Sequence, residues 1–562
     1  MELKLPIGVS DFKEIIENHY TFVDKSLFIK EIIEDGAKVI LITRPRRFGK
    51  TLNLSMLEYY FSNTTSDQQS LFAGLNIGRE IETNKRHMGC YPTIFITFKS
   101  AKFEDYATTY LTLCHLLSDC YQAHRYLLDS PQMHSEDITY FKAILEKKGS
   151  LIDFHNALKK LTTFLHRHWN QKVVLLIDEY DMPVHASYQN GYYAELLEFM
   201  RPLLTTALKD NVDLEKSVLT GILRVAKESI FSGLNNLEVY TLLSREFDQY
   251  FGFLQPEVES LIRQSNENQT PTDLQARIAE CTQWYNGFQI GRATVYNPWS
   301  IIHYVKKDFQ LKPYWVNTSD NALVKSLLAS ATLEVKTDFE QLLQGQTVHQ
   351  EIDENINFAD LANKPLAIWS LLTLSGYLKV VQCELVRGRY LCDLKIPNEE
   401  ILYLYETSIQ NWLGTQGIED PLVIQYLLQK RIEDFQQYLE RFLQESFSFF
   451  DVGTRTPENV YHAFVLGLVV CLRDRYQIKS NRESGLGRYD VMLIPHDRTQ
   501  TGIVLEFKSI DPKSTAAERE TAAKQALQQI ADRGYVAELE QAGIAQHFSL
   551  GIAFAGKTVT IC

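Results

Sequence analysis

The sequence has no C-x-x-C pair among its eight cysteines, which are scattered along 562 residues. Zinc sites and disulfide frameworks are built on regularly spaced cysteines, so the pattern predicts neither and favours a reducing cytoplasm. A long apolar run is also missing. The longest, AFVLGLVVCL, is much shorter than the roughly 20 residues that a helix needs to cross a bilayer. The first residues, MELKLPIGVSDFKE, have no apolar core suited to a signal peptide, and we therefore expect a cytoplasmic protein with no membrane partner.

Positive charge is in deficit, because 57 Lys and Arg face 70 Asp and Glu and the formal net charge is −13. This balance argues against a protein that coats nucleic acid indiscriminately, although a local basic groove is compatible with it. The hydrophobic content of 45% and the charged content of 23% are ordinary for a globular protein. The length predicts about two to four domains.

The stretch LITRPRRFGKTLNLSML, residues 41–57, predicts a strand, a loop and a helix, with Gly49, Lys50 and Thr51 on the loop. In a phosphate-binding loop, backbone N–H groups and the helix N-terminus hold the β-phosphate, Lys reaches the β- and γ-oxygens, and Ser or Thr binds Mg²⁺. The usual GxxxxGK[ST] pattern has glycine where this chain has Arg44. The segment alone therefore leaves open a basic loop in which Gly49 only serves a turn.

A second motif, KVVLLIDEYD at residues 172–181, supplies the acids that a bound Mg²⁺ requires. A run that is apolar on both faces fits a buried parallel strand, and ligands bind at the carboxyl ends of such strands. We expect Asp178 to bind Mg²⁺, directly or through water, and Glu179 to activate the attacking water. The alternative for this segment alone is a buried strand that ends in an ordinary acidic turn.

Other residues of the first 245 are weaker candidates for nucleotide contacts. YPTIFITF at residues 91–98 predicts an extra strand between the two motifs, as in the P-loop ATPases that include the AAA proteins. Thr220, at the end of a predicted fourth strand, is a candidate sensor of the γ-phosphate, and Arg224 a candidate for its charge. Arg46 and Arg47 are candidates for neutralising phosphate charge. The alternative is that they are solvated or pair with the acidic turn after residue 178.

The middle of the chain is rich in aromatic residues, in the segments WYNGF (284–288), VYNPWSI (295–301) and PYWVNTS (313–319). We expect these segments to be core anchors of a mostly helical lid. Residues 367–401 then predict a helix and two β-rich runs about a turn with Arg387, Gly388 and Arg389, which suggests a winged-helix-like module. The expected domains are residues 1–245, 246–400 and 401–562.

The last 160 residues hold a second set of acids. GLGRYDVMLI (485–494) predicts a strand with Asp490, and GIVLEFKSI (502–510) predicts a strand with Glu506 and Lys508. Residues two apart on a strand share one face, so Glu506 and Lys508 point the same way. Two carboxylates that hold Mg²⁺ and a lysine that positions water form a plausible site for phosphodiester cleavage. An E-x-K pair by itself is also compatible with a cross-strand charge pair.

The flanking segments favour the cleavage site. Upstream, a predicted helix has Pro457 in its first turn and Glu458 within reach of the metal. Downstream, AAKQALQQIADRGY predicts a helix that could bring Gln529 near the site, followed by the strand HFSLGIAFA at residues 547–555. The order helix, strand with Asp, strand with E-x-K, helix, strand is that of the PD-(D/E)XK nuclease core.

A series of motifs runs through the chain: LPIGVSDF, FVDKSLFI, RPRRFGKT, LIDEYD, TGILRVAKESIFSGLNN, YNGF, YNPWSI, SGYL, PNEE, VYHAFVLGL, GRYDVML and LEFK. In these motifs and their order the chain resembles bacterial proteins that join an AAA-ATPase-like domain to a C-terminal PD-(D/E)XK nuclease-superfamily domain. The resemblance implies that Arg44 is the normal form of this phosphate loop. It also implies that Tyr489, where the superfamily name has proline, removes no ligand.

By the same resemblance, Lys50, Thr51, Asp178 and Glu179 carry the ATPase motifs, and the acids and lysine of the predicted strands 485–494 and 502–510 carry the nuclease motif. The implied fold class is α/β: a three-layer αβα P-loop domain, a helical and winged-helix-like middle region, and a restriction-endonuclease-like α/β domain. The implied cofactors are ATP and Mg²⁺.

The expected function is nucleic-acid processing by an ATP-hydrolysing protein with a Mg²⁺-dependent nuclease-like domain. DNA is the favoured partner, a homo-oligomer is compatible with the sequence, and defence or mobile-element handling is suggested by analogy alone. The alternative is a nucleotide-switched signalling or nucleic-acid-binding protein whose nuclease-like fold does not cleave. The presence of both acids and the lysine of the second site favours the enzyme, because a domain relieved of catalysis could lose them freely.

Overall fold

The computed structural model describes residues 3–65, 67–224, 236–265, 270–316, 327, 332–356, 366–414, 421–446, 472–484, 487–556 and 558–562. The chain divides into two compact units, Met1–Leu323 with His349–Ile401, and Val324–Val348 with Leu402–Cys562. No described helix combines the length and the apolar character that a bilayer-spanning segment requires.

The first unit is built on a parallel five-stranded sheet with the strand order β2-β3-β4-β1-β5. The strands are β1 (Val39–Thr43), β2 (Thr93–Thr97), β3 (Val173–Asp178), β4 (Leu214–Gly221) and β5 (Leu237–Tyr240). Every residue of β1 and β3 is buried, as expected for apolar runs covered on both faces. The carboxyl ends of these two strands carry the phosphate-loop motif and the acidic motif, so both motifs lie at one edge of the sheet.

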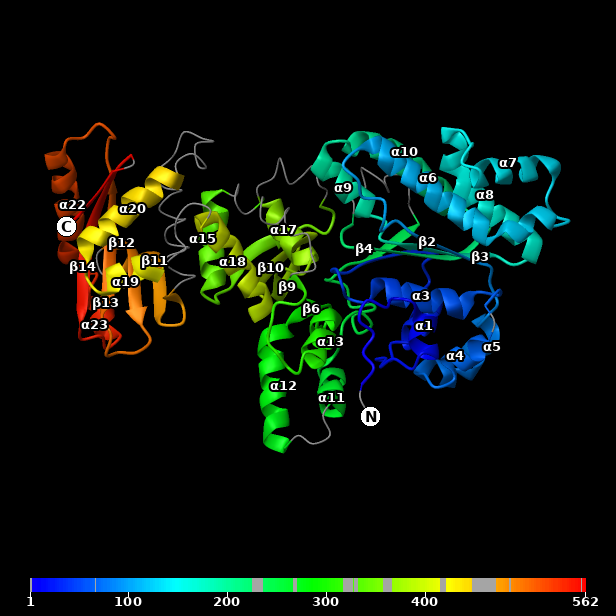
Figure 1. Cartoon of the computed structure of the whole chain (residues 1–562), viewed down its shortest axis with the longest axis horizontal. Helices are drawn as coiled ribbons and strands as arrows, with labels where there is room; N and C mark the ends of the chain where they lie inside the picture. Colours follow the sequence, from blue (N-terminus) through cyan, green and yellow to red (C-terminus); the bar gives the residue numbers. More distant parts are fainter. Residues whose placement is uncertain are drawn as a thin grey trace. The chain divides into compact units, whose positions relative to one another are not determined.

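Helices cover both faces of this sheet (Figure 1). One face carries α1 (Phe12–Glu17), α3 (Lys50–Phe61), α4 (Gln68–Phe72) and α5 (Ile81–His87), and the other carries α6 (Tyr106–Ala123), α7 (Ser135–Leu145), α8 (Leu151–Trp169), α9 (Met182–Asn190) and α10 (Tyr193–Leu208). The remaining helices of this part are α2 (Leu27–Glu34), η1 (Asn76–Arg79) and η2 (Arg125–Asp129). Local signals fix the helix starts, as in α8, where Ser150 and Asp153 form a capping box.

A helical subdomain follows the sheet in the first unit. It contains α11 (Gln255–Ser265), α12 (Pro271–Tyr285), the hairpin of β6 (Phe288–Ile290) and β7 (Ala293–Val295), and α13 (Pro298–Lys306). Tyr285, Tyr296 and Tyr304 are fully buried in its core, so the tyrosines of the YNGF and YNPWSI segments are core anchors, as the sequence predicted.

A helix, a strand, a second helix and a hairpin follow in chain order: α15 (Leu333–Leu343), β8 (Val348–Ile352), α17 (Ala367–Leu374), β9 (Lys379–Val386) and β10 (Arg389–Lys395). The three strands pair in the order β8-β10-β9. The sequence predicted the helix and the hairpin of this winged-helix-like module, and β8 is an addition to them. Arg387 at φ 51° and Gly388 at φ 80° form the left-handed two-residue turn of the hairpin. All seven residues from Ile368 to Leu374 are buried, so this stretch of α17 has no free face for reading a DNA groove.

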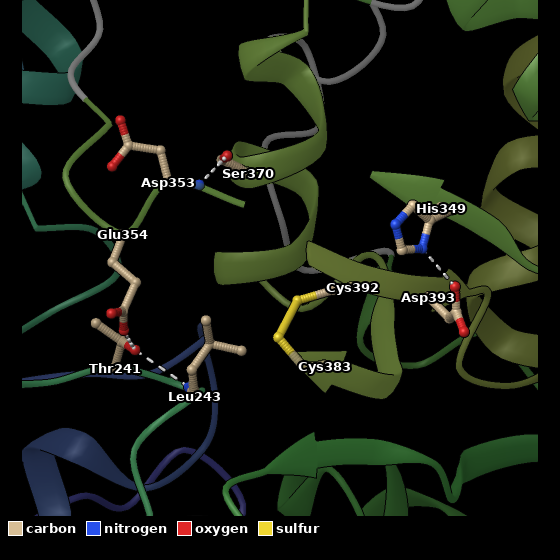
Figure 2. Close-up of a disulfide and its surroundings, with 9 residues drawn as sticks. All are labelled: Thr241, Leu243, His349, Asp353, Glu354, Ser370, Cys383, Cys392 and Asp393. Atoms are coloured by element: carbon tan, nitrogen blue, oxygen red, sulfur yellow. Dashed lines mark hydrogen bonds and ion pairs between the residues drawn. A yellow bond between two sulfur atoms is a disulfide. The ribbon is translucent and has the colours of Figure 1, made fainter. Parts of the chain in front are cut away.

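The hairpin corrects one expectation from the sequence. Cys383 and Cys392 are directly paired across β9 and β10 and form a disulfide (Figure 2), whereas the scattered cysteines predicted none. The two cysteines lie symmetrically about the Arg387–Gly388 turn, so only the strand register brings them together. Spacing along the chain carries no comparable signal.

The second unit contains a mixed sheet with the order β11-β12-β13-β14-β15, in which only β13 and β14 are parallel among the described strand pairs. The strands are β11 (Tyr476–Ser484), β12 (Gly487–Pro495), β13 (Gly502–Ser509), β14 (His547–Ala555) and β15 (Thr558–Ile561). The described helices of this unit are α15 (Leu333–Leu343), α18 (Glu399–Gly414), which begins in the first unit, α19 (Pro421–Leu428), α20 (Ile432–Ser446), α22 (Ala516–Asp532) and α23 (Ala537–Gln541). α22 packs on β13 and β14, and α20 packs on β15.

Candidate functional site

The phosphate loop lies between β1 and α3, and its backbone has the shape of an anion-binding nest. Arg47 has φ 67° and Gly49 has φ 85°, and α3 begins directly afterwards at Lys50. Left-handed residues in such a loop turn successive N–H groups toward a common point, and the N-terminus of α3 adds its own free N–H groups. The loop can therefore cradle a phosphate, although it lacks the usual first glycine.

Lys50 is buried and points back along its own loop. Its Nζ donates hydrogen bonds to the carbonyl oxygens of Arg44 and Pro45, both at 3.1 Å, and lies 3.7 Å from Oε1 of Glu179. The ammonium is thus held between the loop and the acidic motif. A phosphate in the nest would meet this charge directly.

The acid at the end of β3 lies against the first turn of α3. Thr51 Oγ1 donates to Asp178 Oδ2 at 2.8 Å, and Thr220 Oγ1 donates to Asp178 Oδ1 at 2.7 Å. Burial raises the pKa of Asp178, and the neighbouring charge of Glu179 adds to this rise. A hydroxyl and a carboxylate at this distance are the oxygen ligands that suit Mg²⁺ beside a P-loop, so Thr51 and Asp178 fit the metal predicted for them.

Glu179 has a strained backbone, with φ 51°, which costs a non-glycine residue about 1 kcal/mol. Its Oε2 is buried and has no hydrogen-bond partner among the described residues. An unpaired buried carboxylate oxygen costs about 1–3 kcal/mol or more, and strain of this kind clusters at active sites. This geometry suits a carboxylate that acts as a base and accepts a proton from a bound water.

A cavity of about 320 Å³ opens over the loop. It is lined by the phosphate loop, by Glu179, by Lys99 and Lys102 after β2, and by apolar side chains that include Phe22 and Phe253. A cavity with a cationic nest at one part and apolar walls at another suits a nucleotide. Arg46, Arg47, Gly49, Lys50 and Thr51 all line it, so the structure gathers these predicted residues at one site.

The two proposed sensors occupy different positions from the residues that line the cavity. Thr220 is fully buried and its hydroxyl orients Asp178. Arg224 is the last described residue before the segment 225–235, and its Nε has no partner among the described residues. Neither residue lines the cavity, and their roles toward the γ-phosphate stay predictions.

Two residues of the acidic motif form a brace that sequence reasoning missed. The Tyr180 hydroxyl donates to the carbonyl of Leu223 at 2.6 Å, while Asp181 Oδ2 accepts from the N–H groups of Ile222 and Leu223 at 2.7 and 2.9 Å. Burial raises the pKa of Asp181 to about 6, and the charge of Glu179 contributes to the rise. The brace joins the turn after β3 to the loop after β4. The sequence signal that could have revealed this brace is the third carboxylate of LIDEYD, Asp181.

Arg44, which replaces the first glycine, is fully buried and acts as a structural cation. Its guanidinium donates to backbone carbonyl oxygens of Thr43, Tyr240, Thr241, Glu246 and Phe247, at 2.8, 3.0, 2.9, 3.3 and 3.4 Å. It also lies 5.2 Å from the ring centroid of Phe251. Burial lowers the pKa of Arg44 to about 9, so the group stays charged at neutral pH. It fastens the loop to the segment that follows β5.

The same segment is tied to the winged-helix-like module. Figure 2 shows the Thr241 hydroxyl donating to the carboxylate of Glu354, just beyond β8. The Leu243 N–H donates to that hydroxyl at 3.1 Å, and the Thr241 carbonyl accepts from Arg44. Thr241 therefore links Glu354 of the winged-helix-like module to Arg44 of the phosphate loop.

Arg46 and Arg47 meet aromatic residues of the helical subdomain. The Arg47 guanidinium lies 4.3 Å from the ring centroid of Trp299. The carbonyl oxygen of Arg46 accepts from the Trp315 indole at 2.9 Å and from the Asn297 amide at 3.5 Å. Among the described residues neither arginine forms an ion pair with the acidic turn, and Arg47 keeps an exposed side chain on the cavity wall.

The second site lies where β12 and β13 run side by side. The carboxylate of Asp490 accepts from the Phe507 N–H at 2.6 Å, which places it against the strand that carries Glu506 and Lys508. The Lys508 ammonium donates to Gln529 Oε1 at 2.8 Å, and the Gln529 amide donates to Glu506. The structure therefore brings together four of the five residues that the sequence proposed here, from two strands and α22.

The carboxylate of Glu506 is the unusual group of this site. It is 3% exposed, its Oε2 has no hydrogen-bond partner among the described residues, and burial together with the charge of Asp490 raises its pKa to about 7. Burial likewise raises the pKa of Asp490. A divalent cation would stabilise both charges and use the free oxygen. The described part of the chain has no group of three potential ligands, and Glu458, the third predicted ligand, lies outside the described residues.

Gly551 on β14 allows α22 to reach this site. A Cβ atom at this position would collide with the backbone of α22, at the carbonyl of Ala523 and the N–H of Leu527. The absence of a side chain thus lets the helix approach the sheet closely. Gln529 follows two residues after Leu527, so the close approach carries it to Glu506 and Lys508.

Comparison with known families identifies two domains in the chain. Residues 6–231 match a family described as predicted AAA-ATPase, and residues 456–562 match the PD-(D/E)XK nuclease superfamily. An uncharacterized protein in the vnfD 5′ region of Azotobacter chroococcum mcd 1 is 25% identical over 570 residues, which cover 98% of this chain and 96% of the relative. The two family matches confirm the resemblance recognised in the sequence and the α/β fold class.

Proposed function

We propose that this chain, in which an AAA-ATPase-like domain precedes a PD-(D/E)XK nuclease-superfamily domain, hydrolyses ATP and cleaves nucleic acid, with DNA as the favoured substrate. The observation that carries the proposal is the buried, unpartnered oxygen of Glu506 beside Asp490 and Lys508. A fold that only held nucleic acid would gain stability by losing this oxygen. Its retention is expected where a metal ion uses it.

At the first site the roles follow from the contacts. Lys50 leaves the loop carbonyls for the phosphate oxygens, and the nest N–H groups bind the β-phosphate. Thr51 and Asp178 would hold Mg²⁺, which would supply positive charge to neutralise the β- and γ-phosphates. Glu179 accepts a proton from the water that attacks the γ-phosphate, and its unpartnered oxygen supports this role.

At the second site Asp490 and Glu506 would hold a divalent metal, which would polarise the phosphodiester and lower the pKa of a water molecule. Lys508 positions that water, and Gln529 fixes the lysine and Glu506 relative to each other. DNA is favoured over RNA by analogy with nucleases of this superfamily. Defence against foreign DNA or mobile-element handling would suit such an enzyme.

The test uses purified protein with labelled single- and double-stranded DNA and RNA, with and without ATP and with Mg²⁺, Mn²⁺ or EDTA. We expect metal-dependent cleavage by the parent and by Lys172→Ala, an exposed-lysine control. Lys50→Ala should lose ATP binding by about 100-fold or more, and Glu179→Gln should keep ATP bound without turnover. Binding of nucleic acid without cleavage under every condition would favour the nucleotide-switched binding protein instead.

A further inference from the structure

We propose that Trp315 and Asn297 are positioning residues that hold the phosphate loop in its nucleotide-binding shape from outside the loop, and that Glu400 holds both of them in place. The proposal rests on the proposed ATP binding and extends it. Asn297 and Trp315 belong to the YNPWSI and PYWVNTS segments, which were expected only to be core anchors of a lid. Glu400 belongs to the PNEE segment, for which the sequence predicted no role.

The first step concerns the direction of one peptide group. The Arg46 carbonyl accepts from the Trp315 indole at 2.9 Å and from the Asn297 amide at 3.5 Å. Because a trans peptide is planar, its N–H points opposite to its carbonyl, so fixing the Arg46 carbonyl also fixes the Arg47 N–H. Arg47 is a left-handed residue of the nest, at φ 67°. The two donors thus orient an N–H group on which phosphate binding depends.

The second step concerns the buried carboxylate behind these donors. Glu400, in the first turn of α18, is 0% exposed. Its Oε1 accepts from the backbone N–H of Trp315 at 2.6 Å, and its Oε2 accepts from the Ser300 hydroxyl at 2.7 Å. Ser300 lies in the first turn of α13, where Asn297 is the N-cap and accepts the Ser300 N–H at 3.2 Å. One carboxylate therefore fixes the two segments that carry the donors.

Aromatic packing places the indole on the loop. The ring centroids of Trp315 and Phe288 are 5.8 Å apart, and those of Phe288 and Phe48 of the phosphate loop are 5.0 Å apart. Trp315 is 1% exposed, so its indole N–H is desolvated and loses a hydrogen bond outright if the loop carbonyl turns away. This cost opposes any loop shape in which the Arg46 carbonyl faces elsewhere.

The test compares two buried tryptophans of the first unit in the full-length protein. Trp315→Phe keeps an aromatic ring in the cluster and removes the indole N–H, and Trp369→Phe makes the same truncation on α17, where Trp369 is 0% exposed. By calorimetry with ATP and with ADP, we expect Trp315→Phe to weaken both affinities about tenfold and Trp369→Phe to stay within about twofold of the parent. Equal affinities in the two variants would overturn the proposal.

Kinetics separate positioning from a merely structural role. In Glu400→Ala the KM for ATP should rise about tenfold while kcat at saturating ATP stays within about twofold, because Glu179 is untouched. Glu400→Gln, which keeps an oxygen that can accept the Trp315 N–H, should recover most of the affinity. A fall in kcat at unchanged KM, or no recovery by glutamine, would contradict the proposal.

Two further outcomes keep the test decisive. If Trp315→Phe does not fold, Asn297→Ser carries the comparison, because serine still caps α13 but lacks the amide donor, and it should weaken ATP binding by about threefold or more. If the parent itself binds no ATP, the proposed function fails together with this inference. If the parent binds ATP and the variants bind it equally well, only this inference fails.

Discussion

The two sites use the same kinds of group and are held in place in different ways. Each has two acids and a lysine, at the carboxyl end of the parallel sheet in the first site and on the neighbouring strands β12 and β13 in the second. The contacts of the C-terminal site join residues only 17, 21 and 23 positions apart in the chain. The phosphate loop is instead fastened by residues 196 and 269 positions away, through Arg44 to Tyr240 and Trp315 to Arg46.

This difference predicts how each site responds to change. Strand pairing and one helix set the C-terminal site, so local substitutions there should alter one activity alone. The phosphate loop is shaped by the helical subdomain and the winged-helix-like module, since Gly376, which follows α17, packs against Pro45 of the loop. Substitution of residues that contact the phosphate loop from far along the chain should therefore change nucleotide binding.

The largest effect is expected at the C-terminal acids. Asp490→Ala or Glu506→Ala should lower metal-dependent cleavage by about 10³-fold or more, because each removes a proposed metal ligand. ATP hydrolysis should stay within about twofold of the parent, since the two sites lie in separate folding units. Lys508→Ala should also lose cleavage but retain more metal affinity, because lysine is no ligand.

Parallel assays of DNA cleavage and phosphate release check this prediction. Asp497→Ala, which removes an exposed acid from the turn after β12, is the matched control and should keep both activities. An equal loss of ATP hydrolysis in Asp490→Ala would show that the C-terminal site is not self-contained, and the comparison between the sites would no longer hold.

The next effect tests the remote fastening of the phosphate loop. Arg44→Gly restores the ordinary P-loop pattern but removes a buried cation that serves five carbonyl oxygens. We expect the free energy of unfolding of the first unit to fall by about 3 kcal/mol or more. The free energy of unfolding of Arg44→Lys should lie between those of the parent and Arg44→Gly, because an ammonium cannot match the geometry of a guanidinium.

Urea unfolding followed by tryptophan fluorescence and by cleavage activity measures this change for each unit. Only the transition of the first unit should move. Unchanged stability in Arg44→Gly would mean that the loop needs no anchor, and that the arginine in the place of the first glycine has another purpose.

A smaller effect is expected on substitution of Gly551, and it tests whether α22 holds the residues of the C-terminal site in place. Gly551→Ala places a Cβ against the backbone of α22, and the helix must move away from the sheet. Gln529 then loses its bonds to Glu506 and Lys508, and cleavage should fall about tenfold while ATP hydrolysis is unchanged. Gln529→Ala should reproduce this loss. Wild-type cleavage in both variants would contradict the positioning role of α22.

The sequence predicted the elements whose information is local. The fully buried strands β1 and β3 follow from apolar runs, and the grouping of Glu506 and Lys508 follows from the two-residue period of a strand. Asp490 could be placed beside them because the family order of helix and strands is specific.

The contacts that hold the phosphate loop from far along the chain could not be predicted in this way. Arg44 binds backbone carbonyls, which every residue has and which leave no signal in a sequence. The indole of Trp315 was correctly expected in a core, but its acceptor is again a backbone oxygen. The disulfide of Cys383 and Cys392 depends on strand register. The residue types allowed the chemistry of each site to be predicted, whereas the hydrogen bonds to backbone oxygens could be identified only from the structure.

The smallest effect concerns Arg47, whose role in phosphate binding was proposed from the sequence. Its guanidinium stacks on Trp299 at 4.3 Å, and an exposed contact of this kind contributes about 0.5–1 kcal/mol. Arg47→Ala should therefore weaken ATP binding only about threefold, in contrast to Lys50→Ala. If the arginine acts through charge on the phosphates, its loss should affect ATP more than ADP and the difference should shrink at high salt. If it acts by stacking, Trp299→Ala should weaken ATP and ADP equally and adding Arg47→Ala should have no further effect. Isothermal titration of the two single variants and the double variant distinguishes these roles. A loss of about 100-fold in Arg47→Ala would make the loop's own cations, rather than its distant anchors, the main determinant of the ATP site.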